Sequence, residues 1–246
     1  MVVALLADVH ANREALEACL AHARKAGAAR CVFLGDLVGY GADPQAVLDR
    51  VRTEVDAGGR AVMGNHDAAL AGDDSYLNRA AREAIAWTRT ALDADAKAFV
   101  ATLPLSSRDD ASFMVHASAN HPARWTYVDG AAEAQRSSAA AAATWTFCGH
   151  VHEQCLYFEN TQDRMLEFRP TPGNPIPVRG PRRWLAIVGS VGQPRDGSPA
   201  AAYALWDSAR ELITFHRVAY DWRAACAKVR AAGLPEAIAY RLERGI

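Results

Sequence analysis

The first part of the chain alternates short apolar runs with segments whose apolar residues recur at helical spacing. Val2–Leu6 is a continuous apolar run, as expected of a strand covered on both faces, and Asn12 after it is a good helix N-cap. Arg30–Leu34 and Ala61–Met63 repeat the strand pattern, and a helix beginning at Pro44 lies between them. The pattern predicts three βα repeats that deliver polar residues to one edge of a sheet.

The middle of the chain changes from helices to short strands. Residues 78–102 are rich in alanine and predict two helices, the second beginning near Asp93. From Ser112 onward the apolar runs are short and strand-like, and the alanine run Ala139–Ala143 between them predicts a helix. The predicted strands are Phe113–Val115, Trp145–Cys148, Leu156–Phe158 and Met165–Phe168.

The last third combines a break in regular structure with further strands and helices. Residues 170–183 contain five prolines and two glycines, which predicts a long loop or a wide hairpin turn without regular structure. Three apolar runs then predict a β-meander, and the C-terminus returns to two helices. The whole pattern predicts an α/β fold of two packed sheets flanked by helices. The meander comprises Trp184–Val188, Ala201–Trp206 and Leu212–Val218, and the helices comprise Trp222–Ala232 and Pro235–Arg244.

Composition and charge narrow the functional classes. The 246 residues, 50% hydrophobic and 22% charged, suffice for one large core, so we expect a single domain over residues 1–246. The formal net charge of -1 provides no global field for a nucleic acid polymer or a membrane surface, and no apolar run reaches the roughly 20 residues of a membrane span. Met1–Ala7 lacks the basic start of a secretion signal, and the five cysteines are scattered, which predicts a cytoplasmic protein with reduced thiols.

Three short clusters of potential metal ligands follow apolar segments. Residues two apart on an extended segment point the same way, so Asp8 and His10 are expected to bind one ion together, and His150 and His152 are expected to face the same cleft. Asp36, at a neighbouring strand end, could bridge two ions, and Asn65 and His116 supply further ligands. Imidazole, carboxylate and amide groups without thiolate favour Mn, Fe or Zn in a two-metal site. The clusters are Asp8-Val9-His10, Gly64-Asn65-His66-Asp67 and Gly149-His150-Val151-His152.

These residues, in this order, resemble the motifs of the calcineurin-like metallophosphoesterase superfamily. Its motifs D-x-H, G-D, G-N-H-D/E, a lone H and G-H-x-H are all present between residues 8 and 152. The stretch Gly189–Gly197 is similar to the G-S-V-G-x-P-R-x-G stretch of the small prokaryotic YfcE-like and diadenosine-tetraphosphatase-like branches. The resemblance implies a four-layer α/β/β/α sandwich, built from two mixed sheets flanked by helices, with a binuclear metal centre.

The resemblance also implies a role for each motif residue. His66 would face the leaving-group oxygen as general acid or transition-state stabiliser, with Asp67 orienting and charging it, while a metal-bridging hydroxide attacks phosphorus. Arg195, whose motif adjoins a strand end, is the candidate for substrate binding. One metal would be held by Asp8, His10, Asp36 and His152, and the other by Asp36, Asn65, His116 and His150.

Departures from the family pattern bear on the substrate. Protein Ser/Thr phosphatases of the superfamily carry G-D-x-x-D-R-G, whereas this chain has Gly39 and Tyr40 in place of the second Asp and the Arg. We therefore expect a metal-dependent hydrolase of a small phosphorylated molecule, either a phosphodiester or a nucleotide. The alternatives are a Ser/Thr-type protein phosphatase and a non-catalytic metal-binding scaffold of the same fold. His66 and the full ligand set argue against the scaffold.

Overall fold

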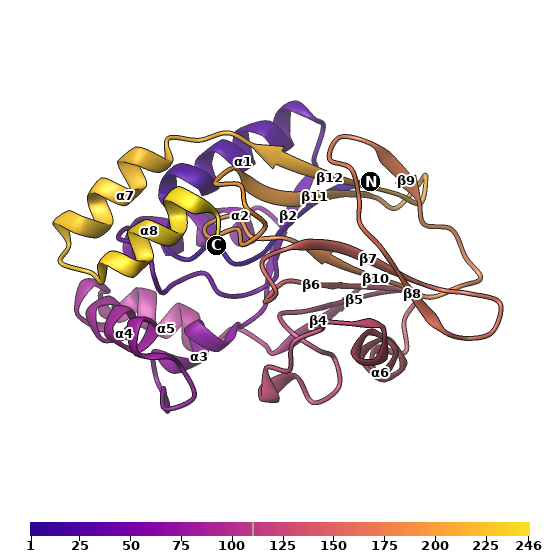
Figure 1. Ribbon diagram of the computed structural model, residues 1–246, viewed down its shortest axis with the longest axis horizontal. Coiled ribbons are helices and arrows are strands. Elements are labelled where there is room, and N and C mark those ends of the chain that lie inside the picture. The colour runs from indigo at the N-terminus through magenta and orange to yellow at the C-terminus, as the bar shows by residue number, and fades with distance from the viewer. Residues whose placement is uncertain (110) are drawn as a thin grey trace.

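Two six-stranded mixed sheets pack face to face at the centre of the molecule (Figure 1). The structure is a computed structural model that describes residues 1–109 and 111–246. Sheet A has the order β3-β2-β1-β11-β12-β9 and sheet B the order β4-β5-β6-β10-β7-β8. Sheet A comprises β1 (Val2–Leu6), β2 (Arg30–Phe33), β3 (Arg60–Ala61), β9 (Pro175–Pro177), β11 (Ala201–Asp207) and β12 (Leu212–Val218). Sheet B comprises β4 (Ser106–Asp109), β5 (Ser112–Val115), β6 (Trp145–Cys148), β7 (Gln154–Glu159), β8 (Met165–Phe168) and β10 (Trp184–Val188).

Helices cover the outer faces of both sheets and one end of the molecule. The helices α1 and α2 pack on sheet A and α6 packs on sheet B, while α4, α7 and α8 gather at the left of Figure 1. Asn12 caps α1 as predicted, because its side chain accepts a hydrogen bond from the backbone N–H of Ala15. The helix predicted to begin near Asp93 is α5, and Asp93 caps it by accepting from the N–H of Ala96. The helices are α1 (Arg13–Lys25), α2 (Pro44–Asp56), α3 (Asn65–Ala69), α4 (Arg79–Ala91), α5 (Ala94–Ala101), α6 (Ala131–Ala141), α7 (Trp222–Ala231) and α8 (Glu236–Arg244), with a 3-10 turn at Pro122–Arg124.

Four buried apolar clusters mark the layers. One lies between the sheets and includes Leu5 and Phe215 of sheet A and Phe147 of sheet B. A second joins sheet A to α1 and α2, and a third joins sheet B to α6. The fourth packs α4, α7 and α8 against Tyr40, which lies in the loop after β2. The first three clusters confirm the predicted four-layer arrangement of two mixed sheets flanked by helices.

Several local predictions were wrong. The expected β-meander does not form, because Trp184–Val188 pairs with β6 and β7 in sheet B while the next two strands pair in sheet A. The proline-rich segment contains a strand, β9, which pairs with β12 at the edge of sheet A. Pro175 and Pro177 have no backbone N–H to donate, and an edge strand tolerates this because it pairs on one side only. The helix expected over Ala139–Ala143 begins eight residues earlier, at Ala131, and ends where Ala142 takes a left-handed conformation. The edge strand β4 and the short helix α3 were not predicted.

The structure also bears on the membrane and thiol predictions. Within the described residues, no helix combines the length and the apolar character that crossing a membrane requires. All five cysteines are free and buried. Burial raises the pKa of the Cys19 and Cys148 thiols, so these groups stay protonated and unreactive.

Candidate active site

The candidate site lies at the carboxyl ends of five strands that run parallel to a neighbour within their sheets. Because both sheets present these ends on the same side of the molecule, loops far apart in sequence meet there. Each predicted ligand is buried, with at most 6% of its surface exposed. Asp8 and His10 follow β1, Asp36 follows β2, Asn65 opens α3 after β3, His116 follows β5, and His150 and His152 follow β6.

The backbone of these loops is not extended, contrary to the expectation from the D-x-H and H-x-H spacing. Five of the predicted ligands have left-handed φ angles, which cost on the order of 1–3 kcal/mol each for residues other than glycine. His150 and His152 nevertheless line the same cleft, as expected, and belong to different groups of potential ligands. Backbone strain of this kind clusters at functional sites. The five are Asp8 (53°), His10 (49°), Asp36 (53°), His150 (68°) and His152 (65°).

One group of ligand atoms gathers around Asp8. The Nε2 atom of His152 lies 3.2 Å from Asp8 Oδ1 and 3.3 Å from His10 Nε2. His10 Nε2 is also 3.9 Å from Asp8 Oδ1 and 3.7 Å from Asp36 Oδ2. Asp36 therefore borders this group.

A second group gathers around His116. Its Nε2 atom lies 3.0 Å from His150 Nδ1, 3.1 Å from Asn65 Oδ1 and 3.4 Å from Asp36 Oδ2. Asp36 thus contacts both groups with the same carboxylate oxygen, as expected of a bridging ligand. By distance alone, a third combination of His10, Asp36 and His66 would also accept an ion.

The ring nitrogens that face away from the two groups fix the orientation of all four imidazoles. Each of these nitrogens lies 2.6–3.1 Å from a backbone carbonyl oxygen, to which it donates as an N–H. Wherever such a ring is neutral, its opposite nitrogen carries a lone pair that points at neighbouring ring nitrogens and at carboxylates. A cation between them resolves this repulsion, and the carbonyl support is the usual second contact of metal-binding histidines. The pairs are His10 with Val38, His116 with Leu34, His150 with Trp125, and His152 with Gln193.

Burial and mutual charges set the protonation of the group. Burial opposes ionisation of Asp8, but nearby imidazoles outweigh it and lower its pKa to about 2; they also hold the pKa of Asp36 well below its ordinary value. Burial lowers the pKa of His10 well below its ordinary value and that of His150 to about 3. His116 differs, because the Asp36 carboxylate outweighs burial and raises its pKa to about 9. Ionised carboxylates and neutral imidazoles are the forms that bind metals.

His66 differs from the four oriented histidines. Its buried Nδ1 atom has no hydrogen-bond partner within the described part of the chain. Packing holds the ring instead, since the rings of Tyr40 and His10 lie 4.6 and 4.9 Å away between centroids. Burial lowers the pKa of His66 to about 4, although the charge of Asp36 opposes this shift. The ring is therefore positioned without the carbonyl contact that marks the other histidines.

Asp67 makes contacts other than those expected. Its carboxylate accepts hydrogen bonds from the backbone N–H groups of Leu37 at 2.9 Å, Val38 at 3.2 Å and Gly64 at 2.9 Å. Burial and then the charge of Asp36 raise its pKa to about 7, while the backbone donors oppose this shift. These contacts join the loop after β2 to the start of α3. Asp67 therefore fixes the loops that carry Asp36 and His66 rather than bonding to the His66 ring.

The glycine-containing stretch after β10 supports the ligands from behind. Ser190 Oγ donates to the carbonyl of Asp8 and accepts from the N–H of Gln193, whose own carbonyl accepts from His152. A side chain at Gly192 would place its Cβ 1.9 Å from the carbonyl oxygen of Val9. The G-S-V-G part of the motif thus holds the β1 and β6 loops together.

A cleft of about 360 Å³ opens beside the ligands. Arg195 lines it, as predicted, and its Nη2 donates to Gln193 Oε1 at 2.9 Å. Four aromatic residues of the lining were not predicted as site residues, because no motif marks three of them and Tyr40 was noted only as a departure from a family pattern. The ring of Tyr127 stacks on His150 at 3.9 Å between centroids. The four are Tyr40, Tyr76, Trp125 and Tyr127.

We predict that Asp36→Asn weakens metal binding, because Asp36 is the carboxylate common to both groups of ligand atoms. Loss of even an outer-shell partner typically costs about 10- to 100-fold in metal affinity, so we expect at least that loss here. Elemental analysis after dialysis against limiting Mn²⁺ measures it. Asp43→Asn is the control, because the Asp43 carboxylate binds Lys228 at 2.7 Å and belongs to neither group. Equal metal contents in wild type and Asp36→Asn would contradict the bridging role.

Comparisons with known proteins agree with this geometry. A protein of Methanocaldococcus jannaschii, itself uncharacterized, is 31% identical over 252 residues, which cover 99% of this chain and 98% of that protein. The crystal structure of a metallophosphoesterase from Sphaerobacter thermophilus has a TM-score of 0.89 and 36% identity, covering 100% of this chain and 99% of that chain. A hypothetical protein from Pyrococcus horikoshii has a TM-score of 0.80 and 18% identity, covering 100% and 98%, which shows likeness of fold alone.

The family assignment rests on the sequence as a whole. The family model for the calcineurin-like phosphoesterase superfamily domain matches residues 1–211, which contain every predicted metal ligand and Arg195. The resemblance found in the motifs is thereby confirmed. The chain belongs to the calcineurin-like phosphoesterase superfamily.

Proposed function

We propose that this protein is a metal-dependent hydrolase of a small phosphorylated molecule, either a phosphodiester or a nucleotide. The observation that carries the proposal is the convergence of imidazole lone pairs on the Asp8 and Asp36 carboxylates beside an open cleft. The cleft volume lies within the range of about 300–1,000 Å³ typical of small-molecule sites. The buried free cysteines suit the reducing conditions of a cytoplasm.

The ligand set suits two transition-metal ions, with Mn, Fe or Zn favoured by its nitrogen and oxygen donors. Asp36 would be shared between them. Such ions supply Lewis-acid polarisation of phosphoryl oxygens and activation of water. One would be held by Asp8, His10, Asp36 and His152, and the other by Asp36, Asn65, His116 and His150.

The remaining residues of the chain would act on the substrate directly or position those that do. His66 lines the cleft next to the ligands, where it would donate a hydrogen bond or a proton to the leaving-group oxygen. Asp67 keeps the two loops around His66 in register. Arg195 would bind phosphoryl oxygens with its guanidinium fork. A metal-supplemented assay of phosphomonoesters, phosphodiesters and dinucleoside polyphosphates tests the function, and hydrolysis of none of them would refute it.

We predict that His66→Gln keeps its metals and loses activity according to the leaving group. General acid catalysis is worth about 10²–10⁴-fold, and an aryl phosphate needs it least because its leaving group is already stable as an anion. We expect a loss of that size on alkyl esters and nucleotides and a smaller loss on p-nitrophenyl phosphate. Metal content and both rates are measured on one preparation.

The metal content and the two rates of His66→Gln distinguish three roles of His66: metal ligand, charge stabiliser and proton donor. Loss of an ion in His66→Gln would show that His66 is a ligand, as the third geometric combination allows. Equal slowing on both substrates would show charge stabilisation without proton donation. His22→Gln is the control, since His22 lies on α1 and bonds to Tyr203. We expect no change in that variant.

Gly39→Ala should impair His66 by a different route. A Cβ at residue 39 would lie 2.3 Å from His66 Nδ1, so the ring must move. Because misplacement by about 1 Å can cost on the order of 100-fold in rate, we expect a 10- to 100-fold lower kcat with metal content unchanged. Gly27→Ala is the control, because the φ angle of Gly27 (+86°) is close to that of Gly39 (+83°) and the backbone strain is therefore similar. A Cβ at residue 27 would have no other atom within 4 Å. Equal kcat in the two variants would show that the His66 position does not matter.

Arg195→Lys should weaken substrate binding. Lysine keeps the charge but cannot contact two phosphoryl oxygens at once, so we expect KM to rise or kcat to fall by about 10-fold. Arg183→Lys is the control, because Arg183 pairs with Glu159 at the end of β7. Steady-state kinetics on the best substrate provide the measurement. Wild-type kinetics in both variants would remove Arg195 from the site.

A further inference from the structure

Tyr40 has a backbone conformation that an unconstrained tyrosine avoids. Its φ is 63°, in the left-handed region, where a bulky side chain is a genuine outlier. The N–H of the next residue, Gly41, donates to the carbonyl of His10 at 3.0 Å, which holds this turn against the β1 loop. The same conformation occurs at five of the predicted metal ligands. Tyr40 therefore shares the strain that marks the functional loops.

The Tyr40 ring is wedged between two site histidines. Its centroid lies 4.7 Å from that of His10 and 4.6 Å from that of His66. Only 5% of the residue is exposed, and α4, α7 and α8 pack against it from outside. Because the Nδ1 atom of His66 has no hydrogen bond, packing against the rings of Tyr40 and His10 and the backbone of Gly39 holds the His66 ring. Tyr40 is thus a positioning residue for His66.

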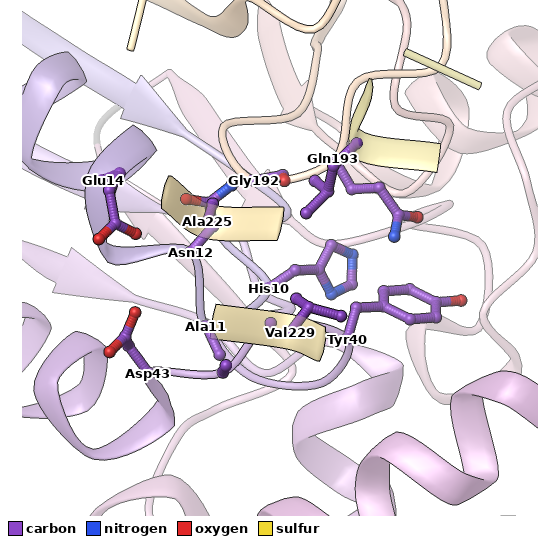
Figure 2. A pocket seen from close by; sticks show the side chains of 13 residues that line it. His10, Ala11, Asn12, Glu14, Tyr40, Asp43, Gly192, Gln193, Ala225 and Val229 are labelled. Carbon is purple, nitrogen blue, oxygen red and sulfur yellow. Dashed lines mark hydrogen bonds between the residues drawn. The ribbon is translucent and has the colours of Figure 1, made fainter. Parts of the chain in front are cut away.

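The hydroxyl of Tyr40 is not used by the fold. It makes no hydrogen bond to any residue that the structure describes, although Tyr40 lines the cleft together with His66 and Arg195. Figure 2 shows the side chains of Tyr40 and Gln193 extending past the His10 imidazole in the same direction. Gln193 in turn holds the Arg195 guanidinium. A neutral phenol donor therefore stands beside a cationic one at the same cleft.

We propose that Tyr40 is a catalytic residue whose hydroxyl donates a hydrogen bond to a non-bridging oxygen of the phosphoryl group. The inference deepens the proposed function and rests on it. The phenol is protonated at neutral pH and needs no proton transfer for this role. It would take the place of the Arg that protein phosphatases of the superfamily carry at this position, with a donor that brings no charge. Arg195 would supply a cationic contact to the same phosphoryl group, and Arg124 also lines the cleft.

Tyr40→Phe tests the hydroxyl alone, because phenylalanine keeps the ring between His10 and His66. A hydrogen bond to a charged group is worth roughly 10- to 100-fold. We expect Mn²⁺-loaded Tyr40→Phe to bind inorganic phosphate about 10-fold more weakly by calorimetry and to show a 10- to 100-fold lower kcat/KM. Metal content and melting temperature should match those of wild type. Tyr240→Phe, on the exposed face of α8, should change none of these quantities.

Tyr40→Leu tests the positioning role, since it also removes the ring beside His66. We expect a further fall in kcat that is larger for alkyl esters than for p-nitrophenyl phosphate, matching the pattern of His66→Gln. Equal phosphate affinity in wild type and Tyr40→Phe would overturn the role of the hydroxyl. Kinetics in Tyr40→Leu that equal those of Tyr40→Phe would overturn the positioning role. If wild type binds phosphate but cleaves no ester, the proposed function fails while the two affinities still decide the role of Tyr40.

Discussion

The buried carboxylates of Asp8 and Asp36 are the constraint on which the site depends. Neither has a Lys or Arg partner among the described residues, and burying an unpaired carboxylate costs several kcal/mol. Backbone N–H groups of His150 and His66 supply part of the compensation. To bring those donors within 3 Å, the loop after β6 must contact the loop after β1, and the loop after β3 must contact the loop after β2. A Cβ at Gly64 would lie 2.2 Å from the N atom of Asp36. Glycine is therefore needed here because the two loops approach so closely, and not because the turn has a left-handed backbone conformation.

The membership of the site was predictable and its geometry was not. Motif order predicted which side chains gather, because each is carried by a loop directly after a strand, and the carboxyl ends of these strands lie on the same side in both sheets. The extended geometry assumed for Asp8 and His10 failed because tertiary contacts impose left-handed φ angles that no local pattern indicates. The contacts of Asp67 were missed for the same reason, since two of its three backbone donors, Leu37 and Val38, come from a loop about thirty residues earlier. Likewise, nothing local to Trp184–Val188 shows that this strand joins β6 rather than β11.

The walls of the cleft could not be predicted from the sequence. Its wall includes Trp125 and Tyr127 from an irregular segment between β5 and α6, in which Trp125 itself has a φ of 54°. The carbonyl of Trp125 holds His150, and Tyr127 stacks on the same ring. An irregular loop carries no periodic pattern, so these roles depend on packing that only the folded chain creates. Second contacts of this kind position a ligand as firmly as the motif that contains it.

The pair Gly39 and Tyr40 connects this packing to the choice of substrate. Protein phosphatases of the superfamily have an Asp where this chain has Gly39, yet any side chain at this position would enter the space of the His66 ring. The loop after β2 therefore cannot adopt their pattern while His66 stays in place. Tyr40 fills the adjacent position with a ring that packs on His66 and with a neutral hydroxyl. Because Tyr40 and His66 both line the cleft, this loop forms part of its wall. A cleft of about 360 Å³ is of the size typical of small-molecule sites, which supports the proposal of a small phosphorylated substrate over a protein surface.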